Sequence, residues 1–191
     1  MDEIANPLEW AAQWLPSNAD PDRPRMTLAT NGVDGFPAAR TVLLSALTPN
    51  GFVFNTDARS RKVADLAQNP KVSLVFIWPG FTRQLVVHGL AQQISVENRE
   101  ATYGKRSPYL KLLAWENTAE FARLSLDERR QRWAELEQQH PDGPTDMSPT
   151  WDGYLVEPTR VMFWEAADDT ASRRTEYTLH SGQWSIDHLP G

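Results

Sequence analysis

Hydrophobic and polar residues alternate along several stretches of this chain, and such alternation is typical of β-strands. Strands are predicted, in chain order, for "RMTLAT", "FPAARTVLLSAL", "GFVFNTD", "KVSLVFIW", "TRQLVVHGLAQQIS", "DGYLVEPTRVMFWEA", "RRTEYTLH" and "QWSIDHL". The run "KVSLVFIW" is almost continuously apolar, which predicts a central strand. Gly89 interrupts the next run and indicates a bulge or a bend there.

Apolar residues at helical spacing separate these strands. Helices are predicted for "NPLEWAAQWL", "SRKVADLAQNP", "VENREATYGK", "PYLKLLAWENTAEFARL" and "LDERRQRWAELEQQH". Asn6 and Ser125 are expected N-caps, and Pro7 and Pro108 suit a first helical position. Strands in hairpin order with inserted helices predict an α+β protein, an antiparallel β-barrel with peripheral helices. The length predicts a single domain spanning residues 1–191.

Composition and charge narrow the function classes. The net charge of −6 and the pI near 5.2 disfavour general nucleic-acid binding. Cysteine is absent, which excludes disulfides and thiolate catalysis. No apolar run approaches the ~20 residues needed to cross a bilayer, and the start "MDEIANPLEW" lacks an apolar signal core. We expect a cytoplasmic protein without membrane or nucleic-acid partners.

One polar cluster stands out, because the usual metal, nucleotide and serine-nucleophile motifs are missing from the sequence. Arg59, Arg61 and Lys62 lie together where a strand gives way to a helix that begins near Ser60. The cluster is either a solvated basic turn or an anion site at a helix N-terminus. Cations at this end of a helix are unfavourable unless an anion compensates them, so both interpretations stay open.

The turn "TPNG" predicts a hairpin between "RTVLLSAL" and "GFVFNTD", because Asn50 and Gly51 both tolerate positive φ. Arg40 begins the first of these strands and is expected to reach the cationic cluster across the hairpin. Asn55 and Thr56 end the second strand and are expected to add neutral hydrogen bonds.

In order and spacing, these segments resemble the pyridoxamine 5′-phosphate oxidase family over nearly the whole chain. The most specific match runs through "SRKVADLAQNPKVSLVFIW" and "RQLVVHGLAQQIS", whereas the helical middle matches only loosely. The family folds as a split β-barrel, binds FMN and works as a homodimer with two sites at the subunit interface. The resemblance therefore implies that the anion is the FMN phosphate.

The resemblance also implies cofactor-binding positions. They are Arg40, Thr41, Val42, Leu43, Leu44, Ser45, Asn55, Thr56, Arg61, Lys62, Gln84, Trp164 and Arg174. Arg61 and Lys62 match the family's phosphate-binding pair. Gln84 matches a glutamine that reaches the flavin of the partner subunit, and Trp164 and Arg174 match residues near the isoalloxazine ring.

The substrate site departs from the family pattern. Ser45 stands where the family has a phosphate-binding lysine, and Thr170 and Ser172 stand where an Arg-x-His pair binds the vitamin B6 substrate. Arg106 matches a substrate arginine, with a solvated loop position as its alternative, and Tyr103 is adjacent to the position of the substrate tyrosine. Phenazine-biosynthesis oxidases of this superfamily share the serine at position 45 but keep the Arg-x-His pair.

The resemblance thus implies an FMN-dependent oxidoreductase that passes a hydride from a small organic substrate to FMN, with oxygen as the expected acceptor and no metal. Its catalytic residues are not identified. One alternative is a genuine pyridoxine or pyridoxamine 5′-phosphate oxidase with a rearranged substrate site. The others are an F420-dependent reductase and a flavin- or haem-binding protein without turnover.

Overall fold

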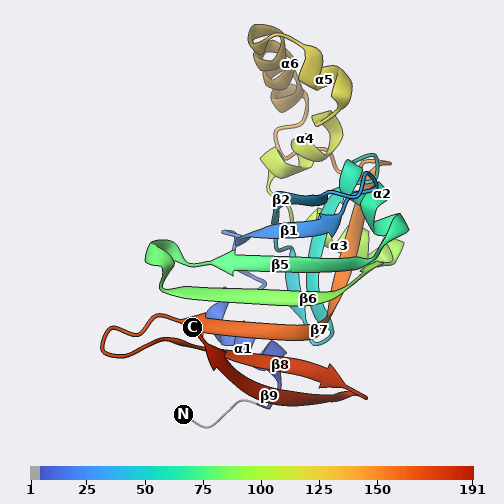
Figure 1. Ribbon diagram of the computed structural model, residues 1–191. Helices are drawn as coiled ribbons and strands as arrows, with labels where there is room; N and C mark the ends of the chain where they lie inside the picture. Colours follow the sequence, from blue (N-terminus) through green and yellow to red (C-terminus); the bar gives the residue numbers. More distant parts are fainter. Residues whose placement is uncertain (1–4) are drawn as a thin grey trace. The chain divides into compact units, whose positions relative to one another are not determined.

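The computed structural model describes residues 5–191, which divide into two compact units. The first unit contains the chain up to Asn55, Arg61–Gln93 and Tyr154–Gly191. The second contains Thr56–Ser60 and Ile94–Gly153. Figure 1 shows the stacked strands of the first unit and the helices of the second. The single domain expected over residues 1–191 stays a prediction.

A curled antiparallel sheet forms the first unit, apart from the end of β4 and the start of β7, which belong to the second unit. Its strands are β1 (Arg25–Asn31), β2 (Pro37–Leu43), β3 (Ala46–Thr48), β4 (Gly51–Asp57), β5 (Lys71–Ile77), β6 (Arg83–Gln93), β7 (Trp151–Glu165), β8 (Arg173–His180) and β9 (Gln183–Pro190). They lie in the order β2-β1-β5-β6-β7-β4-β3, while β8 pairs with β7 and β9 pairs with β8. Figure 1 shows the succession from β2 through β1, β5, β6, β7 and β8 to β9. The predicted α+β class is confirmed, and β5 has the predicted central place between β1 and β6.

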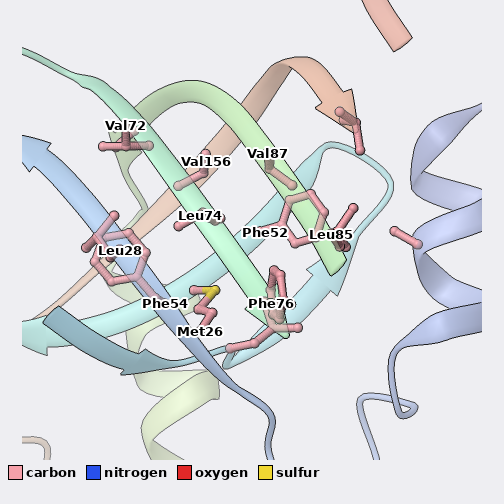
Figure 2. Packing of buried hydrophobic residues seen from close by; sticks show 14 of the residues in the cluster. Met26, Leu28, Phe52, Phe54, Val72, Leu74, Phe76, Leu85, Val87 and Val156 are labelled. Carbon is pink, nitrogen blue, oxygen red and sulfur yellow. The ribbon is translucent and has the colours of Figure 1, made fainter. Parts of the chain in front are cut away.

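The core of this unit forms where the inward-facing residues of neighbouring strands meet. Figure 2 shows these side chains converging from β1, β4, β5, β6 and β7. The labelled residues are Met26, Leu28, Phe52, Phe54, Val72, Leu74, Phe76, Leu85, Val87 and Val156, all buried. Alternation along β1, β5 and β6 therefore sorts residues into a packed interior and an outer face, on which polar side chains are available.

The hairpin predicted around Asn50 and Gly51 forms between β3 and β4. Its first strand is shorter than predicted, because residues 37–43 belong to β2, which pairs with β1 instead. The predicted strand is broken around Ser45, because β2 ends at Leu43 and β3 begins at Ala46. Arg40 lies on β2 and therefore does not reach the cationic cluster across this hairpin, so that route is wrong.

The irregularity predicted at Gly89 is confirmed. The pairing of β6 with β7 shifts register between His88 and Gly89, and Thr159 is the additional residue on the β7 side. A Cβ atom at Gly89 would lie 2.3 Å from the carbonyl oxygen of Glu157, so this close approach requires glycine.

An N-terminal helix, α1 (Pro7–Trp14), covers part of the core. Asn6 caps it as predicted, because its side-chain oxygen accepts a backbone N–H over 2.9 Å. The ring of Trp10 stacks on Phe163 of β7 with centroids 4.1 Å apart, and Trp14 meets the same ring edge-on at 5.1 Å. These aromatic contacts dock the helix on the sheet.

Helices dominate the second unit. They are α3 (Val96–Gly104), α4 (Pro108–Glu116), α5 (Ala119–Arg123) and α6 (Leu126–Gln139). Ser125 and Glu128 form a capping box at the start of α6. The single helix predicted after Pro108 is instead two, because the chain leaves helical geometry at Asn117 and Thr118 caps a new helix. Within residues 5–191, no helix has both the length and the apolar character that a membrane crossing needs.

Candidate functional site

A cationic cluster lies where α2 (Arg61–Gln68) begins, at the helix start predicted from the sequence. The Arg61 side chain is 86% exposed, and its guanidinium lies 3.5 Å from the carboxylate of Asp34. Lys62 follows and is half-buried. The first N–H groups of a helix carry partial positive charge, so helix and side chains together favour an anion with several oxygens.

Arg59 does not take part in this cluster. It belongs to the second unit, where its Nε and Nη2 donate to the two oxygens of Asp57 over 3.0 and 2.6 Å. The hydroxyl of Thr150 also donates to Asp57, over 2.9 Å. The three neighbouring cations of the sequence therefore separate into an Arg59 paired with a carboxylate and an exposed Arg61 next to Lys62.

Arg40 joins the strands of the first unit to α2. Its Nη1 donates to the hydroxyl oxygen of Thr30 over 2.7 Å and to the carbonyl of Leu28 over 3.3 Å. Its Nη2 lies 3.1 Å from Oδ2 of Asp65, which also accepts the Thr30 hydroxyl over 2.6 Å. Because Asp65 lies on α2, this network connects β1 and β2 to the helix that carries Arg61.

Asp65 keeps its charge although its exposed fraction is only 3%. The hydrogen bond from Thr30 is the first cause of a lowered pKa, and the backbone N–H of Val33 and the Arg40 guanidinium add to it against the effect of burial. Sequence reasoning missed both Asp65 and Thr30. One signal was present: Thr30 continues the inward alternation of Met26 and Leu28, where a polar side chain needs a buried partner.

The strand β2 offers backbone groups at the edge of the sheet. It ends the strand order, so one side of its backbone is not used for pairing with β1. The predicted contacts of Thr41, Val42 and Leu43 with the flavin are backbone contacts, which an edge strand is able to supply. The N–H of Leu44 donates to the carbonyl of Pro24, and the cofactor-binding role of Leu44 stays a prediction.

The backbone N–H of Ser45 has a partner within the sheet. It donates to the carbonyl of Val53 over 2.7 Å. Asn55 is half-buried at the end of the same strand as Val53. Thr56 belongs to the second unit, where its hydroxyl lies 3.2 Å from that of Ser60. The cofactor-binding roles of Ser45, Asn55 and Thr56 stay predictions.

Three further predicted cofactor residues form one row across three strands. Gln84 of β6 pairs directly with Trp164 of β7, and Trp164 pairs directly with Arg174 of β8. Directly opposed residues share a face of the sheet, so their side chains emerge side by side. The Trp164 ring also stacks on Phe81, with centroids 4.6 Å apart. The row combines an amide, a flat aromatic ring and a cation.

This row is separate from the cationic cluster within one copy of the chain. The strands β1 and β5 lie between β2, which carries Arg40, and β6, which carries Gln84. Three inter-strand steps correspond to about 14 Å along the sheet. The structure therefore brings Arg40 to the helix of Arg61, and Gln84 to Trp164 and Arg174, but it does not bring the two groups together.

The two predicted substrate residues lie in the second unit. Tyr103 is 2% exposed, and its hydroxyl donates to the carbonyl of Pro144 and accepts from the indole N–H of Trp115, both at 3.1 Å. The Arg106 guanidinium lies 4.3 Å from the ring centroid of Trp151, and burial lowers the pKa of Arg106 to about 10. Arg106 thus stays charged at neutral pH. Roles in substrate binding stay predictions for both.

A family model, described as pyridoxamine 5′-phosphate oxidase, matches residues 19–146. The chain belongs to the pyridoxamine 5′-phosphate oxidase family. Proteins named pyridoxine/pyridoxamine 5′-phosphate oxidase are similar to it: that of Rubrobacter xylanophilus is 36% identical over 83% of this chain and 73% of its own length. That of Cyanothece sp. is 33% identical over 96% of this chain and 88% of its own length. The resemblance inferred from the sequence is confirmed.

Solved structures of the family show the same fold. PhzG from Burkholderia lata, crystallised in complex with tetrahydrophenazine-1-carboxylic acid, has a TM-score of 0.80 at 22% identity and covers 100% of this chain and 95% of its own. A pyridoxamine 5′-phosphate oxidase-related, FMN binding protein from Nostoc punctiforme has a TM-score of 0.70 at 21% identity over 87% of this chain and 88% of its own. The predicted split β-barrel is confirmed.

Proposed function

We propose that this chain is an FMN-dependent oxidoreductase that oxidises a small organic substrate by hydride transfer to FMN, with oxygen as the acceptor. The observation that carries the proposal is the helix start at Arg61 and Lys62, joined to Arg40 through Asp65. Family membership supports an oxidoreductase, and the family's cofactor has a phosphate that such a cluster fits.

The donor set suits the phosphate end of FMN. A phosphate monoester carries close to two negative charges and three acceptor oxygens at neutral pH. The exposed guanidinium of Arg61, the ammonium of Lys62 and the first N–H groups of α2 are all donors with positive character. The guanidinium can donate two parallel hydrogen bonds to phosphate oxygens, and the ammonium attracts the phosphate as a point charge.

The row of Gln84, Trp164 and Arg174 suits the ring end of a flavin. The amide offers a donor and an acceptor to the edge of the ring, Trp164 offers a flat surface, and Arg174 offers positive charge. Bound FMN would supply the hydride acceptor, which no side chain of the protein supplies. The task of these residues is to orient the ring, exclude water from it and favour negative charge nearby.

A homodimer would bring the two groups together. The row lies away from the cationic cluster of its own chain, so we propose that it serves the cofactor of a second copy. Ile77 pairs directly with Gln84 and is 60% exposed, and Phe81, which stacks on Trp164, is 53% exposed. Large apolar side chains exposed beside the row are expected if a partner covers them.

Titration of the apo-protein with FMN, followed by flavin fluorescence, tests the phosphate site. The double variant Arg61→Ala/Lys62→Ala loses two charge-assisted contacts of ~1.5–3 kcal/mol each, so affinity is expected to fall roughly a hundredfold or more. Arg59→Ala is the matched control, because Asp57 already binds that arginine, and it is expected to leave affinity unchanged. Equal affinities for the double variant and the control would refute the phosphate site.

The names of the curated relatives favour a second candidate, oxidation of pyridoxine or pyridoxamine 5′-phosphate. Against it, Ser45 offers no charge where the family has a lysine, and the β7–β8 connection has an exposed Thr170 and a half-buried Ser172 where the family has the Arg-x-His pair. We expect little or no formation of pyridoxal 5′-phosphate by the FMN-loaded protein in air, with bound FMN quantified by absorbance. Turnover at about 1 per second or faster would favour the second candidate.

A further inference from the structure

Asp65 is a buried carboxylate three residues after the predicted phosphate-binding Lys62. Three donors meet it: the Thr30 hydroxyl at 2.6 Å, Nη2 of Arg40 at 3.1 Å and the backbone N–H of Val33. Loss of the carboxylate would leave these donors unpaired in a buried place, at a cost greater than that of a surface ion pair. Asp65 is therefore a fixed point between the helix and the β1–β2 hairpin.

Two positive groups depend on this fixed point. Arg61 precedes Asp65 by four residues, which is about 6 Å along a helix axis, so anchoring Asp65 sets the position of the helix start. Arg40 donates three hydrogen bonds inward, to Leu28, Thr30 and Asp65. A guanidinium has five N–H donors, so two remain, and the Arg40 side chain is 23% exposed.

We propose that Asp65 is a positioning residue for phosphate binding. By holding α2 against the β1–β2 hairpin and fixing the Arg40 guanidinium, it aims the remaining donors of Arg40, the Arg61 side chain and the helix N-terminus at one phosphate group. This inference rests on the proposed function, because the phosphate is that of FMN. Asp65 itself, an anion, makes no contact with the phosphate.

The positioning role and a purely electrostatic role predict opposite results. As a simple negative charge, Asp65 repels phosphate, and its neutralisation would tighten FMN binding. As a positioning residue, it strengthens phosphate binding. Asp65→Asn distinguishes the two, because asparagine keeps the size of the side chain but replaces one acceptor oxygen by an NH₂ donor. That donor would face the donors of Thr30 or Val33.

The measurement compares the dissociation constants of FMN and of riboflavin, which lacks the phosphate, by flavin fluorescence. Asp65→Asn is expected to weaken FMN binding about tenfold or more and to leave riboflavin binding within about twofold. Asp34→Asn is the matched control. It removes an exposed carboxylate that lies 3.5 Å from Arg61, and it is expected to leave FMN binding unchanged or slightly tighter.

Thr30→Val provides a second variant if Asp65→Asn does not fold. It removes one donor to Asp65 without changing any charge, and a smaller selective loss of FMN affinity is expected. Unchanged or tighter FMN binding in the variant that folds would overturn the positioning role, and so would equal losses for FMN and riboflavin. Wild-type protein that binds no FMN would overturn the proposed function itself, which makes the two failures distinguishable.

Discussion

Phe163 and Trp164 are neighbours in β7 that face opposite sides of the sheet, and their truncation should separate packing from binding. Phe163 is 1% exposed and contacts the rings of Trp10, Trp14 and Tyr177 at centroid distances of 4.1, 5.1 and 5.8 Å. Trp164 lies on the outer face and is only partly buried.

The structure sets the expected magnitudes. Phe163→Ala removes a fully buried ring and leaves a cavity under α1, which typically costs ~3–5 kcal/mol of unfolding free energy. Trp164→Ala removes a half-exposed ring whose described aromatic contact is Phe81 at 4.6 Å, so the loss should be about 0.5–1.5 kcal/mol. The loss of flavin affinity should instead be larger for Trp164→Ala than for Phe163→Ala, because Trp164 lies at the proposed ring site.

The assay is urea unfolding followed by far-ultraviolet circular dichroism, together with riboflavin and FMN titrations of each folded variant. Phe163→Ala is expected to lower the urea midpoint strongly and to bind flavin nearly as wild type under stabilising conditions. Trp164→Ala is expected to lower the midpoint much less than Phe163→Ala does and to bind both flavins more weakly. A Trp164→Ala protein as unstable as Phe163→Ala would contradict the assignment of the two faces.

Two further outcomes follow from the sheet. Gly89→Ala should destabilise the protein by roughly 1–3 kcal/mol, because the new Cβ atom would lie 2.3 Å from the carbonyl oxygen of Glu157; Gly104→Ala, with open space around it, should be neutral in the same urea assay. Burial, and then the charge of Arg160, lower the pKa of His88 in the folded protein. As the pH decreases, His88 is therefore protonated in the unfolded state before it is protonated in the folded state. The unfolding free energy should then fall as pH decreases below about 6.5. His88→Gln should weaken this pH dependence between pH 7.5 and 5. An identical pH dependence in the variant and the wild type would contradict the role given to His88.

Local patterns in the sequence were sufficient for the elements but not for all of their partners. The turn at Asn50-Gly51, the cap at Asn6 and the bulge at Gly89 each depend on a residue's own backbone or side-chain chemistry, so they could be predicted. Which strand pairs with β2 depends on contacts distant in sequence, and this is why the placement of Arg40 across the hairpin was wrong.

The candidate site was predictable to the same extent. The helix start at Arg61 follows from local composition, and Gln84, Trp164 and Arg174 were found through the family resemblance. Their alignment in one row depends on the registers of β6, β7 and β8, which sequence alone does not determine. Asp65 could not be assigned, because a single acidic residue in a short polar helix is ordinarily solvent-exposed.

The extra residue at Thr159 has a consequence for how relatives of this chain can differ in length. In β7, even-numbered Val156 faces the core before the bulge, whereas odd-numbered Val161 and Phe163 face it afterwards. Deleting Thr159 would remove the bulge and restore strict alternation, with Val161 and Phe163 still inside, whereas deleting one residue between Val161 and Trp164 with the bulge kept would turn Trp164 into the interior. Natural insertions or deletions at this point should therefore keep the same residues facing the core. They should involve two residues, or one residue together with the loss of the bulge.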